Sequence, residues 1–413
     1  MNAIMIVADG MADRPHPKLK GLTPLEVAET PNMDRVAIEG VCGIHDPISP
    51  GVPPGSDVAN LALLGYEALE VYSGRGAFEA LGAGIELNPG DVAFRCNFAT
   101  VNENLVVLDR RAGRISTKEA EKLAEALKNL KLESYPEVEV EFVNTVEHRA
   151  VLVLRGEKLS NKISDTDPGK TGLKVMECKP LENSFEAKRT AEIVNVIMRK
   201  FYNILKEHPV NLERKKAGFP IANIVLLRGA GIRPEIETLK EKYGIKAVAV
   251  CAVPLVKGVC IAVGMKTLEV PGATGGYDTN LRAKAEAALK ALEESDFVYL
   301  HVKATDLASH DKNPEKKIEV IERVDEMLGL ILDRINLDKT YLVLTADHTT
   351  ASITGEHEGD PVPVVITGLG VRKDDVRKFT ERECAKGGIG RIRAKHIMPT
   401  VMNLIGKMKK LGA

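Results

Sequence analysis

Six short, nearly continuous apolar runs constrain the fold of this chain more than any other feature. They are "IMIVADG", "NIVLLRGAG", "IKAVAVCAV", "FVYLHVKATD", "YLVLTADH" and "PVPVVITG", and all but "IKAVAVCAV" end at a glycine or at a polar residue. Continuous apolar runs are typical of strands buried on both faces. Helical patterns separate them, at 31–40, 56–64, 233–243, 279–294, 313–335 and 396–408. This alternation predicts an α/β fold with a mostly parallel sheet flanked by helices.

The alternation breaks between about residue 87 and residue 215. Segments there alternate apolar with polar residues, as in "DVAFRCNFATV" and "HRAVLVLRG", beside amphipathic patterns at 117–131 and 184–207. We therefore predict an inserted α+β domain at 87–215 within a discontinuous domain formed by 1–86 and 216–413. Hinges are expected at 86–91 and 211–220, where turn-forming and charged residues gather.

Charge and composition exclude several classes of partner. Lysine plus arginine (57) nearly cancels aspartate plus glutamate (58), so no overall field favours nucleic acid or an anionic membrane. No secretory signal and no membrane-spanning run is evident, and the six scattered cysteines suit a reducing cytosol. We expect a cytoplasmic protein with a small-molecule substrate, and leave a homo-oligomer open.

Aspartates and histidines gather where the predicted strands end, which is where parallel sheets bind ligands. Each has an ordinary structural alternative: a turn, a helix cap or a surface histidine. Together they supply the oxygen and imidazole ligands of two divalent cations. The candidates at strand ends are Asp9, Asp306, His310, Asp347 and His348. His357, in "TGEHEGDPVPV", is a further candidate that does not follow a predicted strand.

Ser56 opens a helical pattern in "PGVPPGSDVANLALLGY", residues 50–66. A serine there is commonly an N-cap. It is also placed where a helix N-terminus attracts anions. Two nearby cations would favour the second role, because they can stabilise both oxygens of a phosphoryl displacement and activate a serine hydroxyl.

Several motifs carry a resemblance to a known family: "VADGMAD", "TPNMDR", "PGVPPGSDVANLALLGY", "GRGAFEALGAGIEL", "AFRCNFATV", "KATDLASHD" and "TADHTT". The chain resembles the archaeal-type cofactor-independent phosphoglycerate mutases of the alkaline phosphatase superfamily. The resemblance implies an alkaline-phosphatase-like fold and an isomerase of glycolysis and gluconeogenesis that interconverts 3- and 2-phosphoglycerate without 2,3-bisphosphoglycerate. It also implies that Ser56 is the catalytic residue that accepts the phosphoryl group.

The same resemblance implies two ligand sets. One metal is expected on Asp9, Ser56, Asp347 and His348, and the other on Asp306, His310 and His357. Mixed carboxylate and imidazole ligation suits Mn²⁺, Zn²⁺ or Co²⁺ better than Mg²⁺.

Basic residues of the insertion are the candidates for binding the substrate, because arginine grips carboxylates and phosphates with paired hydrogen bonds. The segment "LDRRAGRI" is similar to an arginine segment of the family's bacterial branch. The candidates are Arg95, Arg110, Arg111, Arg114, His148 and Arg149, with Lys303 outside the insertion. The alternative for each arginine is a solvated surface charge, and for Lys303 the end of a strand.

Two other functions compete with the mutase. One is a phosphatase or phosphonate-cleaving enzyme of the same superfamily, which passes the phosphoryl group to water. The other is a non-catalytic metal-binding protein, against which Ser56 argues, because structural sites close their coordination with cysteine or histidine. The glycine-rich segment 270–284 lacks the lysine and spacing of a P-loop and predicts a turn followed by an N-cap.

Overall fold

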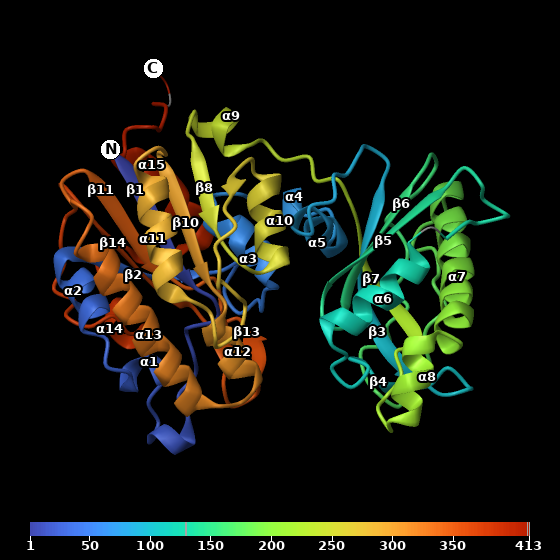
Figure 1. Cartoon of the computed structure of the whole chain (residues 1–413). Helices are drawn as coiled ribbons and strands as arrows, with labels where there is room; N and C mark the ends of the chain where they lie inside the picture. Colours follow the sequence, from blue (N-terminus) through green and yellow to red (C-terminus); the bar gives the residue numbers. More distant parts are fainter. Residues whose placement is uncertain (129, 411, 413) are drawn as a thin grey trace. The chain divides into compact units, whose positions relative to one another are not determined.

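The computed structural model describes residues 1–128, 130–410 and 412. The chain forms two compact units, Met1–Val71 with Ile236–Ala413, and Tyr72–Glu235 (Figure 1). The predicted insertion, 87–215, lies inside the second unit, which extends beyond it at both ends. The expected hinge segments, 86–91 and 211–220, also lie within that unit. The chain passes between units at 71/72 and 235/236 instead.

An eight-stranded, mostly parallel sheet forms the first unit, as predicted. Its order is β15-β2-β14-β11-β1-β10-β8-β9. The strands are β1 (Asn2–Ala8), β2 (Gly40–Asp46), β8 (Ala247–Val250), β9 (Lys266–Thr267), β10 (Phe297–Val302), β11 (Thr340–Thr345), β14 (Val362–Thr367) and β15 (Gly390–Arg393). The parallel core is β11-β1-β10-β8, and β14 pairs antiparallel with both β11 and β2.

The continuous apolar runs form strands whose two faces are both buried. Every residue of β10, β11 and β14 is buried, as are six of the seven in β1. One core lies beneath α2 (Pro31–Glu39), α11 (Leu281–Leu292) and α13 (Pro314–Leu332). Elsewhere in this unit, α3 (Ser56–Leu63) packs against α10 (Pro254–Ala262).

The remaining elements of the first unit are short. They are η1 (Pro17–Leu19), α1 (Pro24–Val27), α4 (Ala68–Val71), α9 (Leu239–Tyr243), α12 (Ala304–His310), β12 (Thr349–Ala351), β13 (Glu356–Glu358), α14 (Glu381–Cys384), η2 (Ala394–His396) and α15 (Ile397–Leu404). The helix expected at 233–243 is only α9, because Thr238 and Glu241 form a capping box that starts the helix at Leu239.

The second unit is an antiparallel sheet with helices on both faces. Its elements are α5 (Arg75–Gly82), β3 (Val92–Val101), β4 (Val107–Asp109), α6 (Thr117–Leu127), β5 (Glu139–Val146), β6 (Arg149–Arg155), α7 (Phe185–Lys206), α8 (Pro209–Lys216) and β7 (Ile224–Ile232). The sheet runs β4-β3-β6-β5, and β7 also pairs with β3. In Figure 1, α5 covers one face of this sheet, and α6 and α7 cover the other.

One predicted strand of the parallel sheet was misplaced. The run "NIVLLRGAG" forms β7, which pairs antiparallel with β3 in the second unit. Its apolar residues are continuous because Ile224, Val225, Leu226 and Leu227 are all buried in the core of that unit. Periodicity alone cannot tell which of two sheets a buried strand joins.

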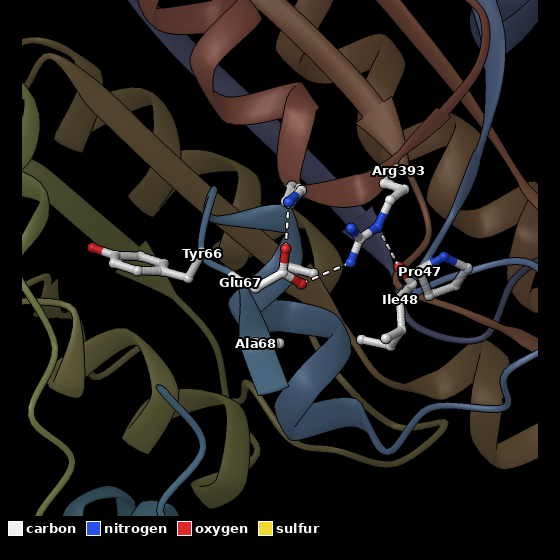
Figure 2. Close-up of a pocket in the computed structure, with 8 residues that line it drawn as sticks. Pro47, Ile48, Tyr66, Glu67, Ala68 and Arg393 are labelled. Atoms are coloured by element: carbon white, nitrogen blue, oxygen red, sulfur yellow. Dashed lines mark hydrogen bonds and ion pairs between the residues drawn. The ribbon is translucent and has the colours of Figure 1, made fainter. Parts of the chain in front are cut away.

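An ion-pair cluster fixes the C-terminal strand of the first unit. Glu67 pairs with Lys395 and, at 2.7 Å, with Arg393, which also donates to the Ile48 carbonyl (Figure 2). These two cations lower the pKa of Glu67. The depression around this cluster has almost no room for a water molecule, so we interpret it as a tightly packed surface contact and not as a ligand site.

None of the helices in the described ranges combines the length and the apolarity that crossing a bilayer requires.

Candidate active site

Three adjacent strand ends build the candidate site of the first unit. Asp9 follows β1, Asp306 lies in the first turn of α12 just after β10, and Asp347 and His348 follow β11. Because β1 pairs in parallel with both β10 and β11, all three carboxyl ends meet at one edge of the sheet. All four side chains are fully buried.

Asp9, Asp347 and His348 form the first group of ligand atoms, all within 4.8 Å of one another. His348 Nε2 lies 3.5 Å from Asp9 Oδ1 and 3.5 Å from Asp347 Oδ2. Ser56 Oγ lies 3.2 Å from the same nitrogen. The structure therefore brings together all four residues of the first predicted ligand set.

Asp306, His348 and His357 form the second group. His357 reaches it from the β12–β13 hairpin, where it pairs in register with Thr350. Its Nε2 lies 3.4 Å from Asp306 Oδ1, and His310 Nε2 lies 3.2 Å from Asp306 Oδ2. The structure thus brings His310 and His357 to Asp306, as the second predicted set requires. His348 is a member of both groups of ligand atoms.

The donor set fits divalent cations, because the carboxylates outnumber the positive charge available to them. Lys303 Nζ contacts Asp9 Oδ1 at 3.0 Å and Asp306 Oδ2 at 2.6 Å. Burial raises the pKa of Asp9, but Lys303 and His301 outweigh it, and the pKa falls to about 2. At Asp347, burial and the charge of Asp9 outweigh the opposing charges of His301 and Lys303 and raise its pKa to about 7. Added positive charge would allow all three carboxylates to ionise.

Ser56 is the first residue of α3 and is not its N-cap. Gly55 occupies the cap position, where no side chain caps the helix. The Ser56 hydroxyl is buried and directed at His348, so the N-cap alternative is wrong for this serine. His357 Nδ1 lies 2.9 Å from the Pro54 carbonyl, which connects the proline-rich approach to the second group.

Asn60 joins the nucleophile to the first group. One turn after Ser56 on α3, its Nδ2 donates to Asp347 Oδ2 at 2.8 Å and to the Ser56 carbonyl at 2.6 Å. Its Oδ1 accepts from the Tyr299 hydroxyl. Asn60 and Tyr299 were not among the predicted site residues, although an asparagine four residues after Ser56 shares its helix face.

Further polar side chains orient the candidate ligands. His301 Nε2 lies 2.9 Å from Asp9 Oδ2, and Thr350 Oγ1 lies 2.8 Å from Asp306 Oδ1 and 3.0 Å from His348 Nδ1. Gly10 adopts φ +61°, and its N–H donates to Asp347 Oδ1 at 3.0 Å. A Cβ there would lie 2.5 Å from Thr350 Oγ1, so the "VADG" turn requires glycine.

An arginine cluster occupies the α5 face of the second unit's sheet. Arg95 on β3 pairs in register with Arg228 on β7, and Glu79 of α5 lies 3.5 Å from Arg95 Nε and 3.3 Å from Arg75 Nε. Asp167 accepts from Arg110 at 3.1 and 2.6 Å and lies 3.5 Å from Arg228. The acidic "SDTDPGK" segment therefore positions arginines.

The cluster carries more positive charge than its acidic partners balance. Burial and then the charge of Arg75 lower the pKa of Arg95, with Arg228 and Arg149 adding to the effect. Burial also lowers the pKa of His148 to about 3, helped by Arg149, Arg111, Arg95 and Arg228. The unbalanced positive charge on this face would attract an anion.

Most of the predicted basic residues therefore lie together, and some cluster members were missed. Arg114 is exposed on the loop after β4, and in the described part of the chain no contact joins it to the cluster. Arg75 and Arg228 are in the cluster but were not predicted. Arg228 was missed because its strand was assigned to the other sheet. Lys303 is at a strand end and also contacts two candidate ligands.

The glycine-rich segment 270–284 forms the predicted turn and cap. The Asn280 side chain accepts from Ala283 N and caps α11.

Two family models match the chain. The model for 2,3-bisphosphoglycerate-independent phosphoglycerate mutase matches residues 37–211, and that for type I phosphodiesterase / nucleotide pyrophosphatase matches residues 182–393. Among relatives, a 2,3-bisphosphoglycerate-independent phosphoglycerate mutase of Methanocaldococcus jannaschii is 50% identical over 410 residues, which are 99% of this chain and 98% of the relative. One of Pyrococcus horikoshii is 48% identical over 99% of this chain and 98% of the relative.

Solved structures agree with these matches. A protein from Pyrococcus horikoshii has a TM-score of 0.88 and 41% identity, covering 100% of this chain and 99% of that one. A cofactor-independent phosphoglycerate mutase from Thermoplasma acidophilum has a TM-score of 0.71 and 38% identity, covering 98% and 100%.

Proposed function

The chain belongs to the 2,3-bisphosphoglycerate-independent phosphoglycerate mutases, and we propose that it interconverts 3- and 2-phosphoglycerate through a phosphoserine at Ser56. The observation that supports this most directly is the position of the Ser56 hydroxyl. It lies 3.2 Å from His348 Nε2, among carboxylates that need added positive charge. A serine serving only as a helix cap would not be directed there.

Two divalent cations complete the site in this proposal. Asp9, Ser56, Asp347 and His348 would hold one, and Asp306, His310 and His357 the other. Mn²⁺, Zn²⁺ or Co²⁺ suit these donors better than Mg²⁺. When bound, such ions supply a Lewis acid for the phosphoryl oxygens and lower the pKa of a coordinated hydroxyl.

The chain's own residues orient the nucleophile. Asn60 fixes the Ser56 backbone relative to Asp347, and Tyr299 fixes the amide of Asn60. His301 and Thr350 hold Asp9 and Asp306 in place. Ser56 Oγ gives up its proton and attacks the substrate phosphorus, the P–O ester bond breaks, and the released glycerate oxygen takes up a proton to become a hydroxyl. The other glycerate hydroxyl then loses its proton and attacks the phosphoserine, whose bond to Ser56 Oγ breaks as that oxygen is reprotonated.

The arginine cluster binds the substrate's anionic groups. Phosphoglycerate carries a carboxylate and a phosphate, and a guanidinium binds either with two parallel hydrogen bonds. Arg95, Arg110, Arg111, Arg149 and Arg228 are the arginines we assign to this role, with His148 among them as a neutral donor or acceptor. The unit that carries them serves as a lid that keeps glycerate from escaping and water from entering during the phosphoserine stage.

The fate of the phosphoryl group tests the proposal against the phosphatase alternative. The purified protein is given 3-phosphoglycerate with Mn²⁺, Co²⁺ or Zn²⁺ and no added 2,3-bisphosphoglycerate. We expect 2-phosphoglycerate as the main product, and no turnover by Ser56→Ala. Glu70→Gln, at an exposed position of α4, is the control and should stay phosphorylatable at Ser56. Inorganic phosphate as the main product would support the phosphatase, and an active Ser56→Ala protein would exclude the serine mechanism.

All six cysteines are free and buried. Because they form no disulfide, we place the enzyme in the cytoplasm, where thiols stay reduced.

A further inference from the structure

A second cavity lies in the Tyr72–Glu235 unit, away from the arginine cluster. Its volume is about 430 Å³, within the range of small-molecule sites. It is lined by residues of α7, by the segment 174–177, and by Leu105 and Ile224. Met198 and Ile224 form its buried floor, and Lys174 and Arg199 stand exposed at its rim.

The cavity and the arginine cluster are on opposite faces of one sheet. On β3, Phe94, Cys96 and Phe98 belong to the core beneath α6 and α7, whereas Ala93 packs with α5. Arg95 alternates with Phe94 and Cys96 and therefore faces α5. The cavity, lined by α7, lies on the other face. It is consequently not part of the proposed substrate site.

The lining has the chemistry of a site for an organic anion with an apolar body. Leu105, Val175, Met176 and Met198 supply apolar surface, and methionines adapt to differently shaped ligands. Lys174 and Arg199 provide two cations against one carboxylate, Glu177. Among the described residues, neither cation has an ion-pair partner, so each is available to a ligand carboxylate.

Thr166 connects the cavity wall to Asp167, which belongs to the arginine cluster. Met176 N donates to the Thr166 carbonyl at 3.0 Å, and Thr166 Oγ1 lies 3.9 Å from Met198 Sδ. Thr166 also exchanges hydrogen bonds with Leu227. The next residue, Asp167, holds Arg110 and Arg228. A ligand that changes the position of this wall would therefore also affect Asp167, which positions Arg110 and Arg228.

We propose that this cavity is an effector site for a small, free organic carboxylate with an aliphatic or aromatic body, coupled to the arginine cluster through Thr166 and Asp167. The binding step is independent of the mutase activity, whereas the coupling step rests on the proposed function. A ligand that favours the arrangement of Thr166 and Asp167 in which Asp167 holds Arg110 and Arg228 strengthens substrate binding, because it shifts the population towards the state that binds substrate.

Octanoate is the probe, and octylamine of equal chain length is its charge-reversed control. Calorimetry on the full-length protein should detect octanoate binding and no comparable octylamine binding. Lys174→Met/Arg199→Met should weaken octanoate binding by about tenfold or more. The matched control is Lys179→Met/Lys188→Met. It removes two exposed lysines that do not line the cavity, one shortly after the segment 174–177 and one on α7, and it should bind octanoate normally. Equal affinity in both double variants, or for both probes, would overturn the site.

Hydrogen exchange locates the ligand, and kinetics test the coupling. Octanoate should slow exchange in peptides covering 172–178 and 195–203, and protection confined to other peptides would overturn the assignment. It should lower the KM for 3-phosphoglycerate in the unaltered enzyme and not in Lys174→Met/Arg199→Met. If octanoate binds but does not change the KM for 3-phosphoglycerate, the coupling is excluded and the proposed binding site still stands. If the protein shows no mutase activity even in the absence of octanoate, the proposed function is wrong, whereas the proposal that the cavity binds a carboxylate is not affected.

Discussion

The side-chain amide of Asn60 donates to both the Asp347 carboxylate, at 2.8 Å, and the Ser56 carbonyl, at 2.6 Å. One side chain therefore fixes the distance between the proposed nucleophile and a proposed metal ligand. Its own orientation is fixed by the Tyr299 hydroxyl, which is fully buried. Partners of this kind orient ligands and raise metal affinity without touching the metal.

Replacing Asn60 should weaken metal binding and slow the phosphorylation of Ser56. We expect Asn60→Ala to reduce metal affinity and kcat by about 10- to 100-fold, because Asp347 Oδ2 loses the hydrogen bond from Asn60. Metal titration by calorimetry and single-turnover formation of phosphoserine measure the two effects. Tyr299→Phe removes one hydroxyl and leaves Asn60 in place, so its effect should be smaller. Unchanged metal affinity in Asn60→Ala would exclude the positioning role.

Removing divalent ions should abolish activity reversibly. Asp9, Asp306 and Asp347 share one neighbouring lysine, Lys303, so the ligand cluster needs added positive charge to ionise fully. Chelation followed by desalting should stop turnover, and Mn²⁺, Co²⁺ or Zn²⁺ should restore it. The same ions should raise the thermal unfolding temperature, because they bind the folded state only. Full activity in a protein with no measurable metal would contradict the two-metal site.

Arginines of the cluster should govern substrate binding and leave the metal site unaffected. Arg95→Ala or Arg228→Ala should weaken binding by about 1.5–3 kcal/mol for each charged hydrogen bond lost. Metal content, measured by elemental analysis, should stay constant. Arg114→Ala is the matched control, because Arg114 is an exposed arginine outside the cluster. If Arg114→Ala raises KM as much as Arg95→Ala, the substrate is not bound by this cluster.

Glu381 should make the protein less stable as pH rises. Burial raises its pKa to about 7, although Asp13 N and the Thr23 hydroxyl donate to its oxygens and Lys317 lies nearby. Between the unfolded value near 4.5 and pH 7, the folded state binds more protons than the unfolded state. Stability therefore falls as pH rises through this window.

Glu381→Gln removes this titration. Its unfolding temperature should exceed that of the unaltered protein at pH 8, and the difference should shrink towards pH 5. Glu383→Gln, two residues later in α14, should show no such trend. An unfolding-temperature difference that does not depend on pH would contradict the raised pKa.

Most of the candidate ligands could be predicted to lie together because they are at strand ends, and strand ends follow from apolar periodicity. Asp9, Asp306, Asp347 and His348 all belong to this class. His357 does not: it reaches the site through the β12–β13 hairpin. The residues alone offered it as a candidate that could equally be a surface histidine, and only the family resemblance assigned it to a particular metal. Asn60 was missed because an asparagine in an apolar helix carries no chemical signal until its partners are known.

The boundary between the two units could not be predicted because their strands look alike in sequence. The first four residues of β7, 224–227, are continuously apolar like the core of β1, and only the pairing of β7 with β3 assigns it to the second unit. Arg228 is in that run, so its position beside Arg95 could not be predicted until the pairing of β7 with β3 was known. Long-range register, unlike local periodicity, has no signature in a single sequence.

The origin of the product's oxygen atoms should separate a mutase from a phosphatase. Both reactions form phosphoserine at Ser56, but a mutase returns the phosphoryl group to glycerate before water reaches it. In ¹⁸O-labelled water we expect 2-phosphoglycerate without solvent oxygen, and inorganic phosphate only as a minor product. Arg95→Ala should raise the share of inorganic phosphate, because glycerate held by fewer arginines escapes more often and leaves phosphoserine to water. Arg114→Ala should keep the original partition. Solvent oxygen in the 2-phosphoglycerate of the unaltered enzyme would mean that the phosphoryl group passes through free phosphate, and the direct return to glycerate would then be excluded.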